Sequence, residues 1–295
     1  YASDTENDNI AIGYQAMVAN TAGGSQNVAV GNYALDALTA GDGNVAIGHN
    51  AMTANTSGEL NTAIGYQALE ASATAAGVVA IGAKALKANL SAGDYNTAVG
   101  ESALTANTTG ASNTAVGRYA MVTNTTASNN TAVGTSSLAV NTTGASNTAL
   151  GYQALVANTT AANNTALGFY TLGANTTGTQ NTAVGVSSLA ANTTGGDNVA
   201  VGQGALGSCT TGGNNIAIGL SSGNNTGNAT TTGAGNIFIG SLSRASENDT
   251  NYTIAIGYNV SGEAGYTTLG QAGSDIRAAH GNVTWATVSD ERYKK

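Results

Sequence analysis

Proline is absent from this chain of 295 residues, cysteine occurs once, and large aromatic side chains are scarce, with two phenylalanines and one tryptophan. The single cysteine, Cys209, excludes a disulfide within the chain and a zinc site built from cysteines. Charged residues make up only 8% of the chain, far below the usual share of about a quarter. This composition does not supply one large hydrophobic core.

Basic residues are equally sparse, with 8 Lys and Arg against 16 Asp and Glu and a net charge of −8. No stripe of Lys and Arg is present to follow a phosphate backbone, so we expect no nucleic-acid partner. No apolar run is long enough to cross a membrane, and no signal peptide is recognisable, so we expect no membrane insertion. The chain begins at Tyr1 and ends at Lys295 in mid-phrase, and we expect it to be part of a longer product.

What the chain does contain is one phrase, Asn-x-Ala-(Ile/Val/Leu)-Gly, repeated almost throughout. Thirteen copies, from Gly13 to Gly219, follow one another at spacings of 17 or 18 residues. A fixed period of this size is the signature of a stacked-repeat architecture, in which each coil is stabilised by its neighbours. The glycines that close the phrase are Gly13, Gly31, Gly48, Gly65, Gly82, Gly100, Gly117, Gly134, Gly151, Gly168, Gly185, Gly202, Gly219, Gly240 and Gly257.

Residues 147–164 are a representative coil. Thr148 and Leu150 alternate with Ala149, and the β-branched or leucine side chain before Gly151 predicts a short strand that the glycine ends with a bend. A second short strand is expected next, with variable outward residues followed by a small residue and a Leu or Met. We expect this Leu or Met, here Leu155, to point inward and meet the Ile/Val row, and Asn-Thr-Thr-Gly to form the return turn.

Each coil then contributes about two large apolar side chains, worth about 1.5–3 kcal/mol each when buried. Ordering the backbone costs about 1–2 kcal/mol for every residue of the coil. A lone chain is therefore expected to be marginal. The surplus of alanines suggests a second close-packed interface. Association of identical chains through it would supply the additional burial that a lone chain lacks.

The repeated phrase resembles the head repeat of trimeric autotransporter adhesins and the same repeat in phage tail fibres, over about residues 9–270. The resemblance implies an all-β fold, a left-handed parallel β-roll or solenoid of about 15–16 coils with a 17-residue period, associated side by side as a homotrimer. The long return turn and the period depart from the adhesin pattern. They put in doubt any transfer of collagen or matrix binding.

The carboxyl end, NVTWATVSDERYKK at residues 282–295, resembles the junction that opens the intramolecular chaperone domain of endosialidases and other tail fibres. That family trimerises the fibre and then cuts itself off, which implies cleavage between Ser289 and Asp290. Ser289 would be the nucleophile and Lys294 its base, since a serine hydroxyl needs a neighbouring base to attack a carbonyl. Tyr293 stands where the family usually has leucine, and a plain polar tail is the alternative interpretation.

These patterns divide the chain into four parts. Residues 1–8 form an N-terminal lead-in, and residues 9–270 form the repeat domain, with a loop insertion at 221–235. Residues 271–288 form a connector, and residues 289–295 start the self-cleaving chaperone domain.

Other candidate sites are weak. Asp42, Asp94 and Asp197 lack the periodicity of calcium-binding rolls, and His49 and His280 have no Cys or Asp cluster beside them, so no metal is expected. No phosphate-binding loop occurs, and no cofactor is expected. Glycosylation sequons recur at one turn position, and their recurrence follows from the repeat: Asn107, Asn124, Asn141, Asn158, Asn175 and Asn192. The tyrosines after the glycine would point outward, either as isolated surface residues, which we favour, or as a row that stacks on sugars: Tyr14, Tyr66, Tyr152 and Tyr258.

The sequence thus predicts an adhesive or structural fibre segment of a phage-type tail fibre, located outside cells or on a virion, and not an enzyme beyond a single self-cleavage. Its expected partners are further copies of itself and an unknown cell-surface receptor, for which a glycan is one candidate; its ligand-binding residues are unknown. One alternative is an ice-binding solenoid, suggested by adjacent threonines such as Thr108-Thr109 and Thr125-Thr126. Another is a structural spacer or a surface filament subunit.

Overall fold

The computed structural model describes residues 8–20, 23–90, 93–224, 231–281 and 286–287, and within these ranges the chain consists of strands and turns without a helix. The chain divides into two compact units, Tyr1–Tyr152 and Gln153–Lys295. Each unit is a parallel β-solenoid, and together they contain about 15 coils of about 17 residues. The expected all-β repeat fold is confirmed.

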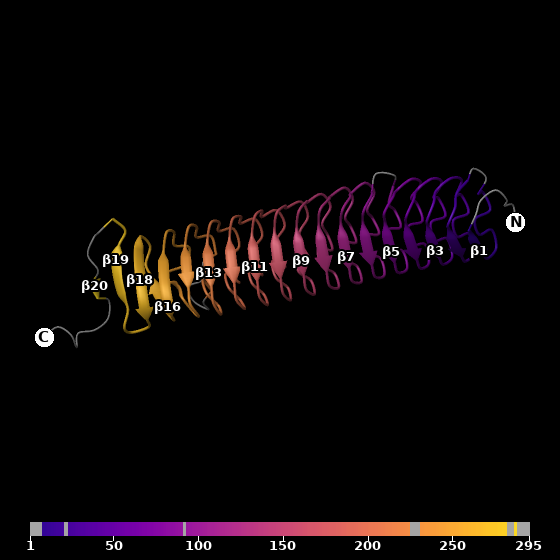
Figure 1. The fold of residues 1–295 in the computed structure, drawn as a ribbon. Helices are drawn as coiled ribbons and strands as arrows, with labels where there is room; N and C mark the ends of the chain where they lie inside the picture. The colour runs from indigo at the N-terminus through magenta and orange to yellow at the C-terminus, as the bar shows by residue number, and fades with distance from the viewer. Residues whose placement is uncertain (1–7, 21–22, 91–92, 225–230, 282–285, 288–295) are drawn as a thin grey trace. The chain divides into compact units, whose positions relative to one another are not determined.

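The first unit stacks one short strand from each coil into a parallel sheet, drawn from indigo to magenta in Figure 1. Neighbouring strands pair in register, so Ala29 lies beside Ala46 and Ala46 beside Ala63. The fixed period is the cause, because it brings the same repeat position to the same place in each coil. The strands are β1 (Ile10–Ile12), β2 (Val28–Val30), β3 (Val45–Ile47), β4 (Thr62–Ile64), β5 (Val79–Ile81), β6 (Thr97–Val99), β7 (Thr114–Val116), β8 (Thr131–Val133) and β9 (Thr148–Leu150).

The second unit repeats this plan and then ends it. Its parallel strands are β10 (Thr165–Leu167), β11 (Thr182–Val184), β12 (Val199–Val201), β13 (Ile216–Ile218), β14 (Ile237–Ile239), β16 (Ile254–Tyr258) and β18 (Tyr266–Gln271). A small parallel pair, β15 (Arg244–Ala245) and β17 (Ser261–Gly262), lies apart from this sheet. Antiparallel β19 (Ile276–Ala279) and β20 (Ala286–Thr287) follow β18, as the yellow end of Figure 1 shows. The hairpin covers the open edge of β18, which would otherwise present unpaired backbone groups.

The interior of each coil is narrower than the sequence suggested. Leu69 and its equivalents are buried, as expected, but the strand residues buried with them are the central ones, such as Ala63, rather than the Ile/Val row. Ile64 points outward. The expected Ile/Val core was therefore wrong, and so was the expected alanine interface between chains, because the strand alanines line the interior. Alternation along a strand allows only one of these two rows inside, and the small one leaves room for leucine.

Gly48 shows why a glycine must end each strand. Its φ is +135°, and a Cβ at this position would lie 2.5 Å from the carbonyl oxygen of Gly65 in the next coil. A side chain here would thus be strained by the backbone and would also collide with the neighbouring coil. The expected bend at this glycine is confirmed.

The segment after the glycine forms turns in the regular coils, and the second strand expected there was wrong. Gln67 and Leu69 both adopt left-handed conformations, with φ of 55° and 51°. The backbone N–H of Gln67 donates to His49 in the preceding coil, and that of Leu69 donates to Ala85 in the following coil, both at 3.0 Å. The left-handed conformation costs about 1 kcal/mol for a non-glycine residue. Hydrogen bonds to both neighbours and the burial of leucine offset that cost.

Two ladders of buried asparagines connect the coils. The first precedes the strands: Asn27 Oδ1 accepts the backbone N–H of Asn44 at 2.8 Å, while Asn44 Nδ2 donates to the carbonyl of Gly58. The second ladder lies at the return turn, where Asn124 Nδ2 donates to Asn107 Oδ1 at 2.9 Å. Buried amides need such partners, because an unsatisfied one costs about 1–3 kcal/mol.

The turn ladder departs from asparagine at three described positions, Leu38, Ser72 and Cys209. Before Ser72, Asn55 Oδ1 accepts the backbone N–H of Gly58 instead, but the other two departures leave an acceptor without a partner. Leu38 follows Asn20 in the ladder and Cys209 follows Asn192, and neither supplies an amide donor. The Oδ1 atoms of Asn20 and Asn192 are both buried without a hydrogen-bond partner. The missing amide in the next coil accounts for each of these unsatisfied atoms.

Replacing Cys209 with asparagine is expected to raise the free energy of unfolding by about 1 kcal/mol, because the new amide would donate to Asn192 Oδ1. Chemical denaturation followed by circular dichroism measures the change. Cys209→Ala is the matched control, since it removes the thiol but supplies no donor. A Cys209→Asn protein no more stable than Cys209→Ala would contradict the ladder explanation.

Candidate functional site

The part of the chain that the structure describes offers no cluster of metal-binding side chains. No group of three or more His, Cys, Asp or Glu side chains there could hold a metal ion. A search of the same residues also finds no helix long and apolar enough to cross a membrane. The predicted self-cleavage residues Ser289, Asp290 and Lys294, together with Trp285, lie outside the described residues.

The sequon asparagines are structural. All six are fully buried in the turn ladder, and their side-chain amides face the neighbouring coils rather than solvent. Asn124 Nδ2, for example, donates to Asn107 Oδ1 and to the carbonyl of Ala127. An amide held in this way is not accessible to a glycosylating enzyme in the folded chain.

The largest unpartnered surface of the first unit is the outer side of its sheet. We call the first and third side chains of strands β1–β9 the strand face. None of them is buried, and exposure reaches 61% at Ile12, 38% at Ile47 and 42% at Leu150. All are Ile, Val, Leu or Thr, and none is charged: Ile10, Ile12, Val28, Val30, Val45, Ile47, Thr62, Ile64, Val79, Ile81, Thr97, Val99, Thr114, Val116, Thr131, Val133, Thr148 and Leu150.

The second unit carries a strand face of the same kind on β10–β14 and β16. Ile216 and Ile218 of β13 are both exposed, and so is Leu167 of β10. Parallel sheets are normally covered on both faces, and a long uncharged face of this kind marks an interaction surface. The sequence contained the signal for it in the strict Ile/Val/Leu row, but that row was assigned to the interior.

A second surface feature is a row of four rings on successive coils of the first unit, which we call the aromatic row: Tyr14, Tyr33, His49 and Tyr66. Their ring centroids are 5.6, 5.9 and 5.7 Å apart in that order. Tyr14 and Tyr66 are 63% and 49% exposed. The sequence had suggested Tyr14 and Tyr66 as isolated outward residues, and the structure connects them through Tyr33 and His49.

Tyr33 lies two residues after its glycine rather than one, so the spacing of the other tyrosines does not include it. His49 is not a tyrosine, so the expected tyrosine row passed over it as well. Tyr258, the fourth member of the expected tyrosine row, is exposed in the second unit and has no ring contact with any residue that the structure describes.

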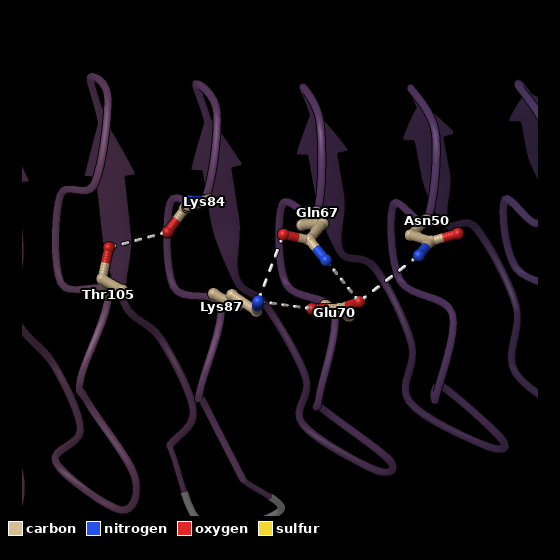
Figure 2. Close-up of polar contacts among 6 residues, drawn as sticks. All are labelled: Asn50, Gln67, Glu70, Lys84, Lys87 and Thr105. Atoms are coloured by element: carbon tan, nitrogen blue, oxygen red, sulfur yellow. Dashed lines mark hydrogen bonds and ion pairs between the residues drawn. The ribbon is translucent and has the colours of Figure 1, made fainter.

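A polar network connects the turns of neighbouring coils in the first unit, and Figure 2 shows its members Asn50, Gln67, Glu70 and Lys87. Glu70 accepts hydrogen bonds from Gln67 at 3.0 Å and from Asn50 at 3.4 Å. Lys87 Nζ donates to Gln67 Oε1 at 3.1 Å and lies 3.3 Å from the Glu70 carboxylate. The network holds two amide side chains in place and balances its one negative charge with one positive charge.

The adjacent threonines of the return turn do not form a common face. The Thr108 hydroxyl donates to the carbonyl of Thr125 in the next coil at 3.0 Å and is partly buried, whereas Thr109 is exposed. Threonines that share one flat surface lie instead on the strand face, where Thr97, Thr114 and Thr131 occupy the first position of consecutive strands.

Cys209 is buried within the second unit, and its thiol lies 3.5 Å from the carbonyl oxygen of Gly212. Burial away from water raises the pKa of the thiol to about 11, because the charged thiolate loses its solvation. A protonated, inaccessible thiol is a poor nucleophile and a poor metal ligand. The residue is a break in the asparagine ladder and not a reactive site.

The folded protein holds the Cys209 proton more tightly than the unfolded chain does, because the pKa of the thiol is higher in the folded state. The protonated thiol therefore makes its full contribution to the free energy of unfolding below about pH 9, and this contribution is lost as the pH rises towards about 11. The expected loss is about 3 kcal/mol. Unfolding free energies of the protein and of Cys209→Ala, measured across this range, should converge as the pH rises. Parallel pH profiles for the two proteins would contradict the burial of the thiol.

Comparison of the chain with protein family models, with curated proteins and with solved structures returns no match in any of the three. A function has to be argued from the two surfaces described above.

Proposed function

We propose that this chain is a segment of a trimeric adhesive fibre, most similar in kind to a phage tail fibre, that works outside cells or on a virion surface in attachment to a host. The observation that carries the proposal is the strand face: a continuous uncharged row of Ile, Val, Leu and Thr along each unit with no cover from the described residues. The repeated Asn-x-Ala-(Ile/Val/Leu)-Gly phrase and the SDERYKK terminus support the same assignment by resemblance.

Association through the strand face has a clear energetic basis. Each partly exposed Ile, Val or Leu that becomes buried contributes about 1 kcal/mol, and every coil of a unit adds at least one such side chain. The gain therefore grows with the number of coils, as does the cost of ordering them. Three identical faces arranged around one axis form a closed assembly, in which no apolar face is left exposed to bind further copies.

The association test is native mass spectrometry of the chain, together with the double variant Ile47→Glu/Val116→Glu on the strand face. The wild-type chain is expected to be a trimer and the double variant a monomer, because burying uncompensated carboxylates costs several kcal/mol each. Val186→Glu is the control, since Val186 is an exposed apolar residue outside the strand face. A monomeric or dimeric wild-type chain would overturn the trimer, and disruption by the control variant would remove the role of the strand face.

Ice binding remains the second candidate, and one observation favours it. The strand face of β6–β9 has Thr in the first position and Val or Leu in the third, which gives parallel rows of threonine hydroxyls and methyl groups on a flat sheet. The two functions need the same face, so a trimer that buries it has no ice-binding surface. A monomer with thermal hysteresis that Thr114→Lys abolishes would replace the fibre proposal.

Self-cleavage is a separate proposal that rests on the resemblance of residues 282–295 to chaperone junctions. When the chain is expressed with the sequence that follows it in its gene, the mature product should end at Ser289, and Ser289→Ala should leave the chain uncut. Denatured mass spectrometry distinguishes the two products. An uncut wild-type chain would remove the cleavage step without affecting the trimer.

A further inference from the structure

The aromatic row differs from the other repeated features because the fold does not require it. The position after the glycine in later coils holds Ala83, Glu101 and Thr135 as well as Tyr152 and Phe169, and all of these coils keep the same strands and turns. The four rings therefore concentrate aromatic surface on four successive coils without a structural need for it. Exposed aromatic surface gathered in this way is typical of a binding site.

The rings do not cover one another completely. Tyr14 and Tyr33 meet edge to face at an interplanar angle of 83°, and Tyr33 and His49 meet at 70°. His49 and Tyr66 are stacked at 27°, so each covers one face of the other and leaves its second face uncovered by that partner. In an edge-to-face pair, the ring that contributes its edge keeps both of its faces free of its partner. The hydroxyl groups of Tyr14, Tyr33 and Tyr66 make no hydrogen bond to any residue that the structure describes, so faces and hydroxyls are both available to a ligand.

Amide residues directly follow two of the rings in the chain, Asn50 after His49 and Gln67 after Tyr66. Glu70 fixes both amides and Lys87 also holds Gln67, in the network of Figure 2. Preorganised amides on the same coils as exposed aromatic rings match a ligand whose rings carry C–H groups on their faces and hydroxyls around their edges. That chemistry belongs to pyranose sugars.

Charge narrows the choice of ligand further. The Glu70 and Lys87 charges pair with each other, and the whole chain carries a net charge of −8. A polyanion such as single-stranded nucleic acid, which also stacks on aromatic rings, would be repelled overall. An uncharged polymer is favoured, and one ring contact per coil favours a linear chain that runs along the stack.

We propose that the aromatic row binds a linear neutral oligosaccharide, with successive sugar units packed against Tyr14, Tyr33, His49 and Tyr66 and their hydroxyls bonded by Asn50 and Gln67. The site lies on the turn segment, apart from the strand face, and a monomeric chain would carry the same row. The proposal therefore goes beyond the association of the chains and stands or falls separately from it.

The test uses the full chain and a panel of linear glucose and N-acetylglucosamine oligomers of increasing length, with binding measured by saturation-transfer NMR and calorimetry. At least one series should bind, with an affinity that rises from the disaccharide to about the tetrasaccharide and then levels off, because the row contains four rings. Tyr33→Ala or His49→Ala should weaken binding about tenfold each.

Tyr258→Ala is the matched control, because Tyr258 is an exposed tyrosine directly after its glycine but has no ring neighbour. It should bind like the wild type, and circular dichroism should show that all three variants keep their fold. Absence of binding to every oligomer, an affinity independent of length, or an equal loss in Tyr258→Ala would overturn the proposal. Native mass spectrometry of the same samples reports the oligomeric state separately, so failure of the sugar site and failure of the trimer are distinguishable.

Discussion

Stacking of near-identical coils is the constraint on which the rest of this structure depends. A coil of about 17 residues cannot satisfy its own backbone, so its N–H and C=O groups bond to the coils before and after it. Buried asparagines extend the same connection from side chains, with each amide reaching the backbone or the amide of a neighbour. Because both ladders need the same residue at the same place in every coil, the period is fixed by hydrogen bonding as much as by packing.

The narrow interior follows from this stacking and decides what lies outside. Most coils enclose one Leu or Met, a few alanines and the ladder asparagines, and there is no room for a second large row. The β-branched residues of the strands are consequently displaced to the outer side of the sheet. A fold that buries alanine and exposes isoleucine leaves apolar surface in contact with water, and this is the physical argument for the proposed association.

The turns that follow each glycine provide a surface whose side chains can vary, unlike those of the strand face. Their structure is held by backbone hydrogen bonds and a buried leucine, so the outward side chains after each glycine are free to vary between Tyr14, Glu101 and Arg118 without a change in fold. Variation at constant backbone allows a repeat protein to carry a ligand site on a few coils only. The aromatic row on the first four described coils is such a local departure.

The sequence by itself determined the repeat, the strand in each coil, the glycine bend and the buried Leu/Met, because each of these depends on local chemistry at a fixed spacing. The tertiary structure decided which side of the strand is inside. Alternation places Ala63 and Ile64 on opposite sides but does not say which side faces inward; that depends on the width of the coil, which the left-handed turns at Gln67 and Leu69 set. It also decided that rings from four separate coils meet, since Tyr14 and Tyr66 are far apart along the chain and become linked only when the coils stack.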